Sequence, residues 1–277
     1  MTDESHRQMH AGGGNPPRAH CVAEPALEFA RGVGGRRSHS FVKFHRNEQA
    51  HQISAYRGNN IQRAAGSGKR EAGSRELAAD NLLFVVPWIL IGYAVGSVPF
   101  AFLLARRAGI DVRVTGSGNV GAANVLRTSG TPLGVAVMAL DITKGVAAVL
   151  AAHAAAGSVP SAAAAGAAAI VGHIYPVWLR FHGGKGVAVA AGVFAVLAPV
   201  ATVAAVAVFL STVWFTRVIS LGSVAATVTL PSIAWIAGAP PSVLIAALGT
   251  GALILFRHRA NVRRIVHGTE RRVGERR

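Results

Sequence analysis

The sequence predicts an all-α fold, a polytopic transmembrane bundle of about seven helices with polar loops on the cytoplasmic side. Two observations carry this prediction. The 277-residue chain is 51% hydrophobic but only 14% charged, whereas soluble domains average about 25% charged residues. The charge is also unevenly divided, because residues 1–80 hold 12 Lys and Arg with 8 Asp and Glu, whereas residues 81–277 hold 16 and 4. Residues 81–277 are therefore predicted to form a membrane domain.

Residues 1–80 are predicted to be a disordered, polar and basic N-terminal extension, because they contain no apolar run long enough to build a core. A basic arm that binds lipid headgroups is the functional alternative, and a start site assigned too far upstream is another. The first residues lack the apolar segment of a secretory signal peptide. The single cysteine, Cys21, argues against an internal disulfide framework.

Charge-free stretches locate the spans. Residues 82–105 contain no charged residue, and about 24 residues suffice to cross a hydrocarbon core of roughly 30 Å. The other continuous spans are expected at residues 131–157, 161–179, 221–238 and 242–256.

Residues 187–216 are ambiguous, because one helix of this length would measure about 45 Å, too long for an ordinary span. Two helices broken near Pro199 place Arg217 on the same side as the other basic loops, as the positive-inside rule favours. The result is seven helices, with the N-terminus outside and the C-terminus inside. The outer turns then carry no Lys or Arg, but the basic extension must cross the membrane.

The first polar loop, residues 106–130, contains the pattern G-x-G-x-x-G at Gly116, Gly118 and Gly121. A dinucleotide-binding loop needs a strand before it and a βαβ unit around it, whereas here the neighbours are spans. Glycines still let backbone N–H groups approach an anion closely. The loop therefore predicts a phosphate site, with a tight turn and a snorkelling Arg as the alternative. Its further candidate binding groups are Ser117, Asn119, Asn124 and Arg127.

The second polar loop, residues 180–186, opens a helix with three glycines and a lysine: Gly183, Gly184, Lys185 and Gly186. Such a segment is suited to phosphate binding. It is not a Walker A loop, because Leu179 and Gly186 stand where that motif requires Gly and Ser or Thr. The alternative is a flexible turn whose lysine follows the positive-inside rule.

The third polar segment starts at Arg257. If the last helix continues, His258 and Asn261 share a face and can orient a hydroxyl or contact a phosphate; an arginine collar facing headgroups is the alternative. Asp141 and Lys144 also share a face, within the second span. Ionisable residues at such a depth indicate a functional site by default, but a mutually neutralising structural pair is an equal interpretation.

His153 and His173 are interpreted as ordinary helix-end or cavity residues. No set of His, Cys and carboxylates has the spacing of a metal site, so no metal and no cofactor is predicted. On the predicted topology the three polar segments converge on the cytoplasmic face. The residues alone thus predict a membrane-embedded site for phosphate-bearing molecules, beside helices able to hold an acyl chain.

At these residues the sequence resembles the bacterial acyl-phosphate:glycerol-3-phosphate acyltransferase family. The resemblance covers about residues 82–270. It rests on motifs in the same order: Gly-Ser-Val-Pro-Phe at 96–100, the loop at 116–127, Asp-Ile-Thr-Lys-Gly at 141–145, Gly-His-Ile-Tyr-Pro at 172–176, Phe-His-Gly-Gly-Lys-Gly at 181–186, Arg-Val-Ile-Ser at 217–220, and His-Arg-Ala-Asn at 258–261 followed by Gly-Thr-Glu at 268–270.

The resemblance implies a seven-helix enzyme of the bacterial inner membrane with a cytoplasmic active site. Such an enzyme moves an acyl group from acyl phosphate, not acyl-CoA, to the sn-1 hydroxyl of glycerol 3-phosphate, giving lysophosphatidic acid and phosphate. Its partners are these substrates and membrane lipid, with no nucleic acid and no obligate protein partner expected. The catalytic residues it implies are Ser117, Arg127, Lys185, His258 and Asn261.

Two positions depart from the family pattern, which usually has Thr at Ala123 and Lys at His182. Lys185 and Arg127 are expected to stabilise phosphate charge. A substrate phosphate is the expected proton acceptor, with His258 as the alternative. A transporter or channel for an organophosphate anion is the competing function, and a structural membrane protein is a third.

Overall fold

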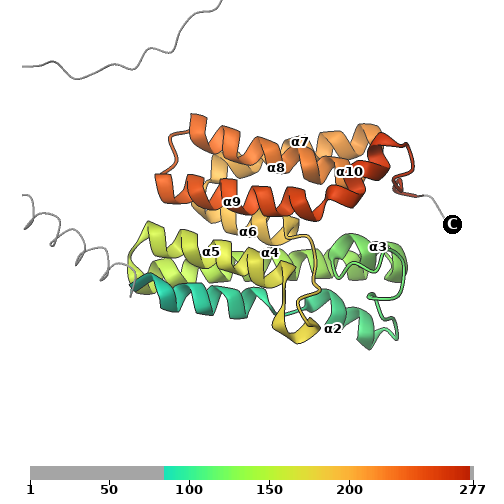
Figure 1. Ribbon diagram of the computed structural model, residues 1–277, viewed down its shortest axis with the longest axis horizontal. Helices are drawn as coiled ribbons and strands as arrows, with labels where there is room; N and C mark the ends of the chain where they lie inside the picture. The colour runs from blue at the N-terminus through green and yellow to red at the C-terminus, as the bar shows by residue number, and fades with distance from the viewer. Residues whose placement is uncertain (1–83, 275–277) are drawn as a thin grey trace, which may run out of the picture. The chain divides into compact units, whose positions relative to one another are not determined.

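The computed structural model describes residues 84–274, so the predicted extension over residues 1–80 lies outside the described residues. All regular structure in that range is helical, which confirms the predicted all-α class (Figure 1). In chain order, helical residues 84–96 are followed by α2 (Phe100–Arg107), α3 (Ala122–Ser129), α4 (Thr131–Ala156), α5 (Val159–Ile174), the 3₁₀ turn η1 (Val177–Leu179), α6 (Val187–Leu197), α7 (Pro199–Thr216), α8 (Ile219–Ile236), α9 (Pro241–Arg257) and α10 (Arg259–Val266).

Five helical segments among residues 84–274 are long and apolar enough to cross a membrane, or six if the bent pair α9 and α10 is one span. The predicted count of seven is therefore not confirmed. The predicted break of residues 187–216 is confirmed, because α6 ends at Leu197 and α7 begins at Pro199. The 11 residues of α6 extend only about 16 Å at 1.5 Å per residue, too short for a full crossing.

The first predicted span is interrupted. Helical residues 84–96 end before Pro99, and α2 begins directly after it. Proline has no N–H and disfavours helical geometry in the residue before it, so Val98 leaves the helix. The carbonyl of Val98 instead accepts a hydrogen bond from Lys144 Nζ at 2.9 Å.

The polar loops contain more structure than expected. The first one includes α3, which begins after the extended backbone of Gly121. The third span, expected to run to Leu179, leaves α-helical geometry after Ile174 and continues as η1. Pro176 explains that break as Pro99 explains the first one.

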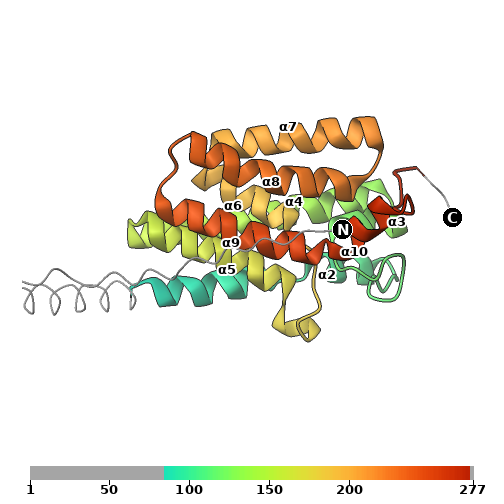
Figure 2. The same cartoon turned by 45° about the horizontal axis from the view of Figure 1, so that its top comes forward.

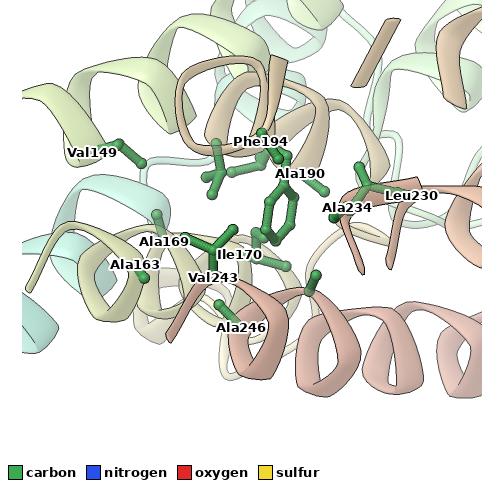
Figure 3. Close-up of a cluster of buried hydrophobic side chains, with 14 of the residues drawn as sticks. Val149, Ala163, Ala169, Ile170, Ala190, Phe194, Leu230, Ala234, Val243 and Ala246 are labelled. Carbon is green, nitrogen blue, oxygen red and sulfur yellow. The ribbon is translucent and has the colours of Figure 1, made fainter. Parts of the chain in front are cut away.

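The short helix α6 forms the centre of the bundle, where it packs against α4, α5, α7 and α9. Figure 3 shows the ring of Phe194 of α6 among small aliphatic side chains from its neighbours. Small residues allow this close packing. For example, a Cβ on Gly192 would lie 2.0 Å from the carbonyl oxygen of Ile142 on α4.

α3 and α10 lie at the same end of the bundle, as two views show (Figures 1 and 2). The chain beyond α10 returns to the turn between α7 and α8, where the N–H of Val273 donates to the carbonyl of Arg217 at 2.7 Å. Polar segments distant in sequence are thereby collected at one end.

Candidate active site

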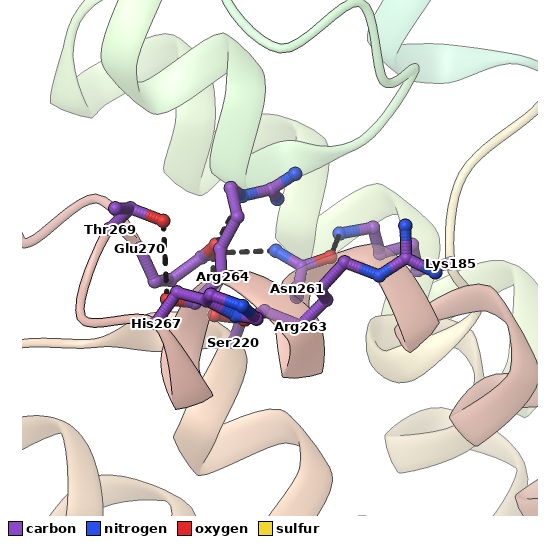
Figure 4. Close-up of polar contacts among 8 residues, drawn as sticks. All are labelled: Lys185, Ser220, Asn261, Arg263, Arg264, His267, Thr269 and Glu270. Carbon is purple, nitrogen blue, oxygen red and sulfur yellow. Dashed lines mark hydrogen bonds and ion pairs between the residues drawn. The ribbon is translucent and has the colours of Figure 1, made fainter.

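A chain of polar contacts links the second polar loop to the C-terminal segment (Figure 4). The ammonium of Lys185 donates to Asn261 Oδ1, and Asn261 Nδ2 donates to Glu270 Oε1 at 2.5 Å. Glu270 also accepts from Ser220 Oγ at 2.7 Å and from Arg264 Nε at 2.6 Å. Lys185 is thus held in place by a neutral amide, which a carboxylate fixes from the far side.

A bend places the histidine and the asparagine of the third polar segment. The axes of α9 and α10 differ by 57°, so the last helix continues only with a sharp bend. His258 lies at the bend and Asn261 one turn into α10, and both are buried. The bend brings Asn261 within reach of Lys185.

The orientation of His258 determines which ring nitrogen is available. Its Nδ1 lies 2.8 Å from the carbonyl oxygen of Ile254. A carbonyl oxygen can only accept, so Nδ1 carries the proton and Nε2 of the neutral ring keeps its lone pair. The free nitrogen of His258 is therefore a proton acceptor.

Positive charge exceeds negative charge around Lys185. Burial lowers the pKa of Lys185 to about 8; the Glu270 carboxylate opposes this shift, whereas Arg264, Arg127 and Arg257 add to it. Burial would raise the pKa of Glu270, but hydrogen bonds from Ser220, Arg264 and Asn261 outweigh burial and lower it. Glu270 is thus a carboxylate that only partly balances four cations.

The side chain of Asn124 holds the first polar loop together. It is 1% exposed, accepts from the N–H of Ser117 at 2.9 Å, and donates to the carbonyls of Val112 and Thr115 at 3.0 Å. A Cβ on Gly116, whose φ is +69°, would lie 2.4 Å from Asn124 Oδ1. Asn124, predicted to bind substrate, is therefore fully engaged by its own loop.

The other predicted glycine contacts are also internal. The N–H groups of Gly118 and Gly121 donate to Thr115 O and Asn119 O at 3.3 and 3.1 Å. The side chain of Asn119 lies against Gly121, whose added Cβ would be 2.9 Å from Asn119 Nδ2. These N–H groups form hydrogen bonds within the loop, and the predicted substrate contacts of Gly118 and Gly121 stay a prediction.

In the second loop the glycines serve close packing against the end of α5. The N–H groups of Gly183 and Gly184 donate to Ile174 O and His173 O, each at 3.1 Å. A Cβ on Gly183 would lie 2.2 Å from the His173 carbonyl oxygen. Gly186, with φ +89°, packs against Ile170 and Ile174 of the same helix. The fold itself uses the N–H groups of Gly183 and Gly184, so the predicted phosphate contact of this loop stays a prediction that these two N–H groups do not carry.

The three polar segments do come together. An added Cβ on Gly184 would lie 2.9 Å from the carbonyl oxygen of Val120, so the first and second loops are in contact. Arg127, on α3, is electrostatically coupled to Glu270, and burial lowers its pKa. Ser117 is exposed on the first loop, and its hydroxyl makes no hydrogen bond within residues 84–274.

The chain matches the family model described as "Glycerol-3-phosphate acyltransferase" over residues 86–268. It is 43% identical over 182 residues to the glycerol-3-phosphate acyltransferase of Geobacter sulfurreducens, a match that covers 66% of this chain and 94% of that relative. The chain belongs to the glycerol-3-phosphate acyltransferase family. Another member, from Roseobacter denitrificans, is 45% identical over 189 residues, covering 68% of this chain and 94% of that relative.

Solved structures of this acyltransferase family have the same fold. The crystal structure of PlsY (YgiH), an integral membrane glycerol 3-phosphate acyltransferase, in its glycerol 3-phosphate form matches with a TM-score of 0.66 and 39% identity, covering 69% of this chain and 96% of that one. The lysophosphatidic acid form matches with a TM-score of 0.64 and 38% identity, covering 69% and 95%. The chain is thus an integral membrane enzyme with several spans.

Sequence reasoning on this acyltransferase missed the anchoring residues Glu270, Ser220 and Arg264. Two signals were available: Glu270 is one of only four acidic residues in residues 81–277, and both Glu270 and Ser220 lie in motifs that carry the family resemblance. The departure at His182 lies on the surface, with Nδ1 2.6 Å from the carbonyl of Arg180. The other departure, Ala123, lies in the first turn of α3. No group of three His, Cys, Asp or Glu side chains able to hold a metal occurs in the described part of the chain.

Proposed function

We propose that this acyltransferase uses acyl phosphate as the donor, transfers its acyl group to the sn-1 hydroxyl of glycerol 3-phosphate, and releases lysophosphatidic acid and phosphate. The observation that carries the proposal is the half-buried ammonium of Lys185, held by neutral Asn261 and surrounded by arginines. Both substrates carry a phosphate, and such an excess of positive charge favours them.

Arg257 adds a further donor for an anion. Its Nη2 approaches the carbonyl of Gly183 at 3.5 Å, and its guanidinium lies 5.7 Å from the centre of the Tyr175 ring. Its Nε is buried and has no hydrogen-bond partner among residues 84–274. A buried donor without a partner is costly, and a substrate oxygen would satisfy it.

In the reaction the sn-1 hydroxyl oxygen forms a bond to the acyl carbonyl carbon, and the bond from that carbon to the phosphate oxygen breaks. The electron pair leaves with the phosphate, whose charge Lys185 and Arg127 stabilise. The hydroxyl proton passes to a phosphate oxygen of the substrate. Ser117, His258 and Asn261 orient the reactants, and His258 Nε2 is the alternative proton acceptor.

The glycines and Asn124 take a supporting role in this proposal. They set the shapes of the two loops, whereas side chains carry the substrate contacts. Asn119 and Ser117 remain the neutral donors of the first loop that can face a ligand, since Asn124 is engaged.

The direct test supplies the purified full chain with acyl phosphate and labelled glycerol 3-phosphate, and in parallel with acyl-CoA. We expect labelled lysophosphatidic acid with acyl phosphate alone. Product formed from acyl-CoA but not from acyl phosphate would overturn the donor assignment. Absence of product, together with uptake of label into liposomes, would support the competing transporter function.

The role of His258 is tested with His258→Gln, whose amide can occupy the position of Nε2 without acting as a base. We expect turnover within about threefold of wild type if a substrate phosphate takes the proton, because only an orienting hydrogen bond changes. A loss of about 10²-fold or more would instead assign the base role to His258.

We also propose that the chain lies in the bacterial inner membrane with the active site and C-terminus in the cytoplasm. The site end carries the basic residues, including Arg106 and Arg107 in the last turn of α2, as the positive-inside rule favours. Labelling of Ser158→Cys from outside intact cells, in a chain with Cys21→Ser, tests this. Labelling only after permeabilisation would contradict it.

A further inference from the structure

A second polar cluster lies behind the loop that carries Lys185. It comprises Asp141 and Lys144 of α4 and His173 of α5, all buried. Lys144 Nζ lies 2.8 Å from Asp141 Oδ1 and 3.0 Å from His173 Nδ1. His173 Nδ1 also lies 3.5 Å from Asp141 Oδ1, which is longer than its contact with Lys144. Because an ammonium can only donate, His173 Nδ1 accepts from Lys144 and the proton of the neutral ring is on Nε2.

The Nε2 edge of His173 faces the second loop. A Cβ on Gly184 would lie 2.1 Å from this nitrogen, so the ring packs directly against the glycine. The carbonyl of His173 also accepts the N–H of Gly184 at 3.1 Å. His173 therefore holds Gly184, the residue before Lys185, through both its ring and its backbone.

A small cavity of about 10 Å³ is lined by both Ser97 and His173. A volume of this size holds about one water molecule. Ser97 Oγ is buried and has no hydrogen-bond partner in the described part of the chain, which is unfavourable unless a water satisfies it.

We propose that His173 is a positioning residue for Lys185, and that a water molecule bound between Ser97 Oγ and His173 Nε2 completes its contacts. Lys144 fixes one edge of the ring and the water fixes the other, so that the ring holds Gly184 at a defined place. The kinetic consequence rests on the proposed role of Lys185 in phosphate binding, whereas the position of the loop can be measured separately.

The first variant is Ser97→Ala, which removes a buried hydroxyl that has no hydrogen-bond partner among residues 84–274. If the Ser97 hydroxyl had no hydrogen-bond partner at all, its removal would leave the stability of the protein unchanged or raise it. If it binds the water, we expect faster amide hydrogen exchange over residues 183–186 and a KM for glycerol 3-phosphate raised about threefold, the effect of one weakened water-mediated contact.

The second variant is His173→Asn, whose amide oxygen can replace Nδ1 as the acceptor for Lys144 while the Nε2 edge is lost. We expect KM to rise about tenfold with kcat within about twofold of wild type, because binding geometry changes more than the chemical step. Exchange over residues 183–186 should again be faster.

The control is Thr202→Val, which removes a buried hydrogen bond from Thr202 Oγ1 to Ala198 O at 3.1 Å at the start of α7. It should lower Tm and change neither KM nor the exchange of the loop. Wild-type exchange over residues 183–186 in both Ser97→Ala and His173→Asn would overturn the proposal. A third outcome is faster exchange over residues 183–186 in Ser97→Ala and His173→Asn together with a normal KM in Lys185→Ala. It would support the positioning of the loop and refute the proposed phosphate contact of Lys185.

Discussion

Two lysines of this protein lie close to polar partners, yet their surroundings differ in charge balance. Lys144 is buried in the bundle, and its ammonium meets Asp141 Oδ1, His173 Nδ1 and the carbonyl of Val98 within 3.0 Å. The contacts with Val98 and His173 are hydrogen bonds, and the contact with Asp141 is an ion pair. The protein thus neutralises the charge of this lysine and supplies its acceptors.

Lys185 is half-buried, and its protein acceptor is the neutral amide of Asn261. The nearby carboxylate of Glu270 is already occupied by Ser220, Asn261 and Arg264. The charge of Lys185 is therefore incompletely balanced. Burial is the main cause of its lowered pKa, and Arg264, Arg127 and Arg257 add to that shift.

The difference separates a structural pair from a binding group. A charge that the protein neutralises stabilises the fold only while both partners remain. A charge that the protein leaves unbalanced costs stability and remains available to an anionic substrate. Substitution of Lys144 should therefore lower stability, whereas substitution of Lys185 should lower activity.

The largest effect is expected for Lys144→Met, which leaves Asp141 buried without its cation. Breaking a buried pair from one side costs about 3–5 kcal/mol, so Tm in detergent should fall sharply. The double variant Asp141→Leu/Lys144→Met is the control and should recover much of the loss, because an apolar pair replaces both charges. A wild-type Tm for Lys144→Met would show that the pair is not structural.

Lys185→Ala should reduce activity without reducing stability. We expect kcat/KM to fall about 10²–10³-fold, the usual cost of removing one donor to developing charge. Tm should stay equal or rise, because burial lowers the pKa of Lys185 to about 8, below about 10.4 for an exposed lysine, and so disfavours the charged form in the fold. A large drop in Tm would place Lys185 in the same class as Lys144.

The pH profile sharpens the same comparison. With a pKa of about 8, Lys185 is protonated at pH 7 and loses its charge as pH rises. We therefore expect kcat/KM to fall with rising pH above 8, approaching tenfold per unit, as for a single required protonated group. The phosphate group itself, with a second pKa of about 6, is already dianionic in this window.

Lys185→Arg is the control for that profile, because a guanidinium stays charged throughout. Its remaining activity should be flat between pH 7.5 and about 9.5, well below an arginine pKa of 12.5 or more. A wild-type profile without the alkaline fall would refute the titration of Lys185 in this range.

The fold could be predicted from the sequence wherever one local signal dominated. Pro199, supported by the distribution of basic loops, predicted the division between α6 and α7. Pro99 carries the same signal, but the absence of charge over residues 82–105 outweighed it, and the break was missed. The short helix α3 was missed because its glycine-rich surroundings indicate a loop.

The site could be predicted only in part. Lys185, Arg127 and Asn261 were identified and lie at the same end of the bundle. Their anchoring by Glu270 and Ser220 depends on a segment that returns after α10 across 50 residues of sequence, which no local pattern encodes. The glycines were assigned to ligand binding because a sequence does not show whether a backbone N–H is already bonded.

Glu270→Gln is expected to have the smallest effect. It keeps the shape of the side chain, and its amide oxygen can still accept from Asn261 and Ser220. Its amide nitrogen cannot accept, so the hydrogen bond from Arg264 Nε is lost. Replacing charged by neutral hydrogen bonds weakens each one by about half, and we expect KM for glycerol 3-phosphate to rise about threefold to fivefold.

The pH profile of Glu270→Gln distinguishes this role from simple loss of packing. The Glu270 carboxylate raises the pKa of Lys185 against the effect of burial, so its neutralisation should lower that pKa and move the alkaline fall to lower pH. Asp111→Asn removes a carboxylate that is paired with Arg113 at 2.6 Å on the first loop, and it should leave the profile in place. An unshifted profile in Glu270→Gln would mean that Glu270 holds Asn261 without tuning Lys185, and the contrast between the two lysines would then rest on hydrogen bonding alone.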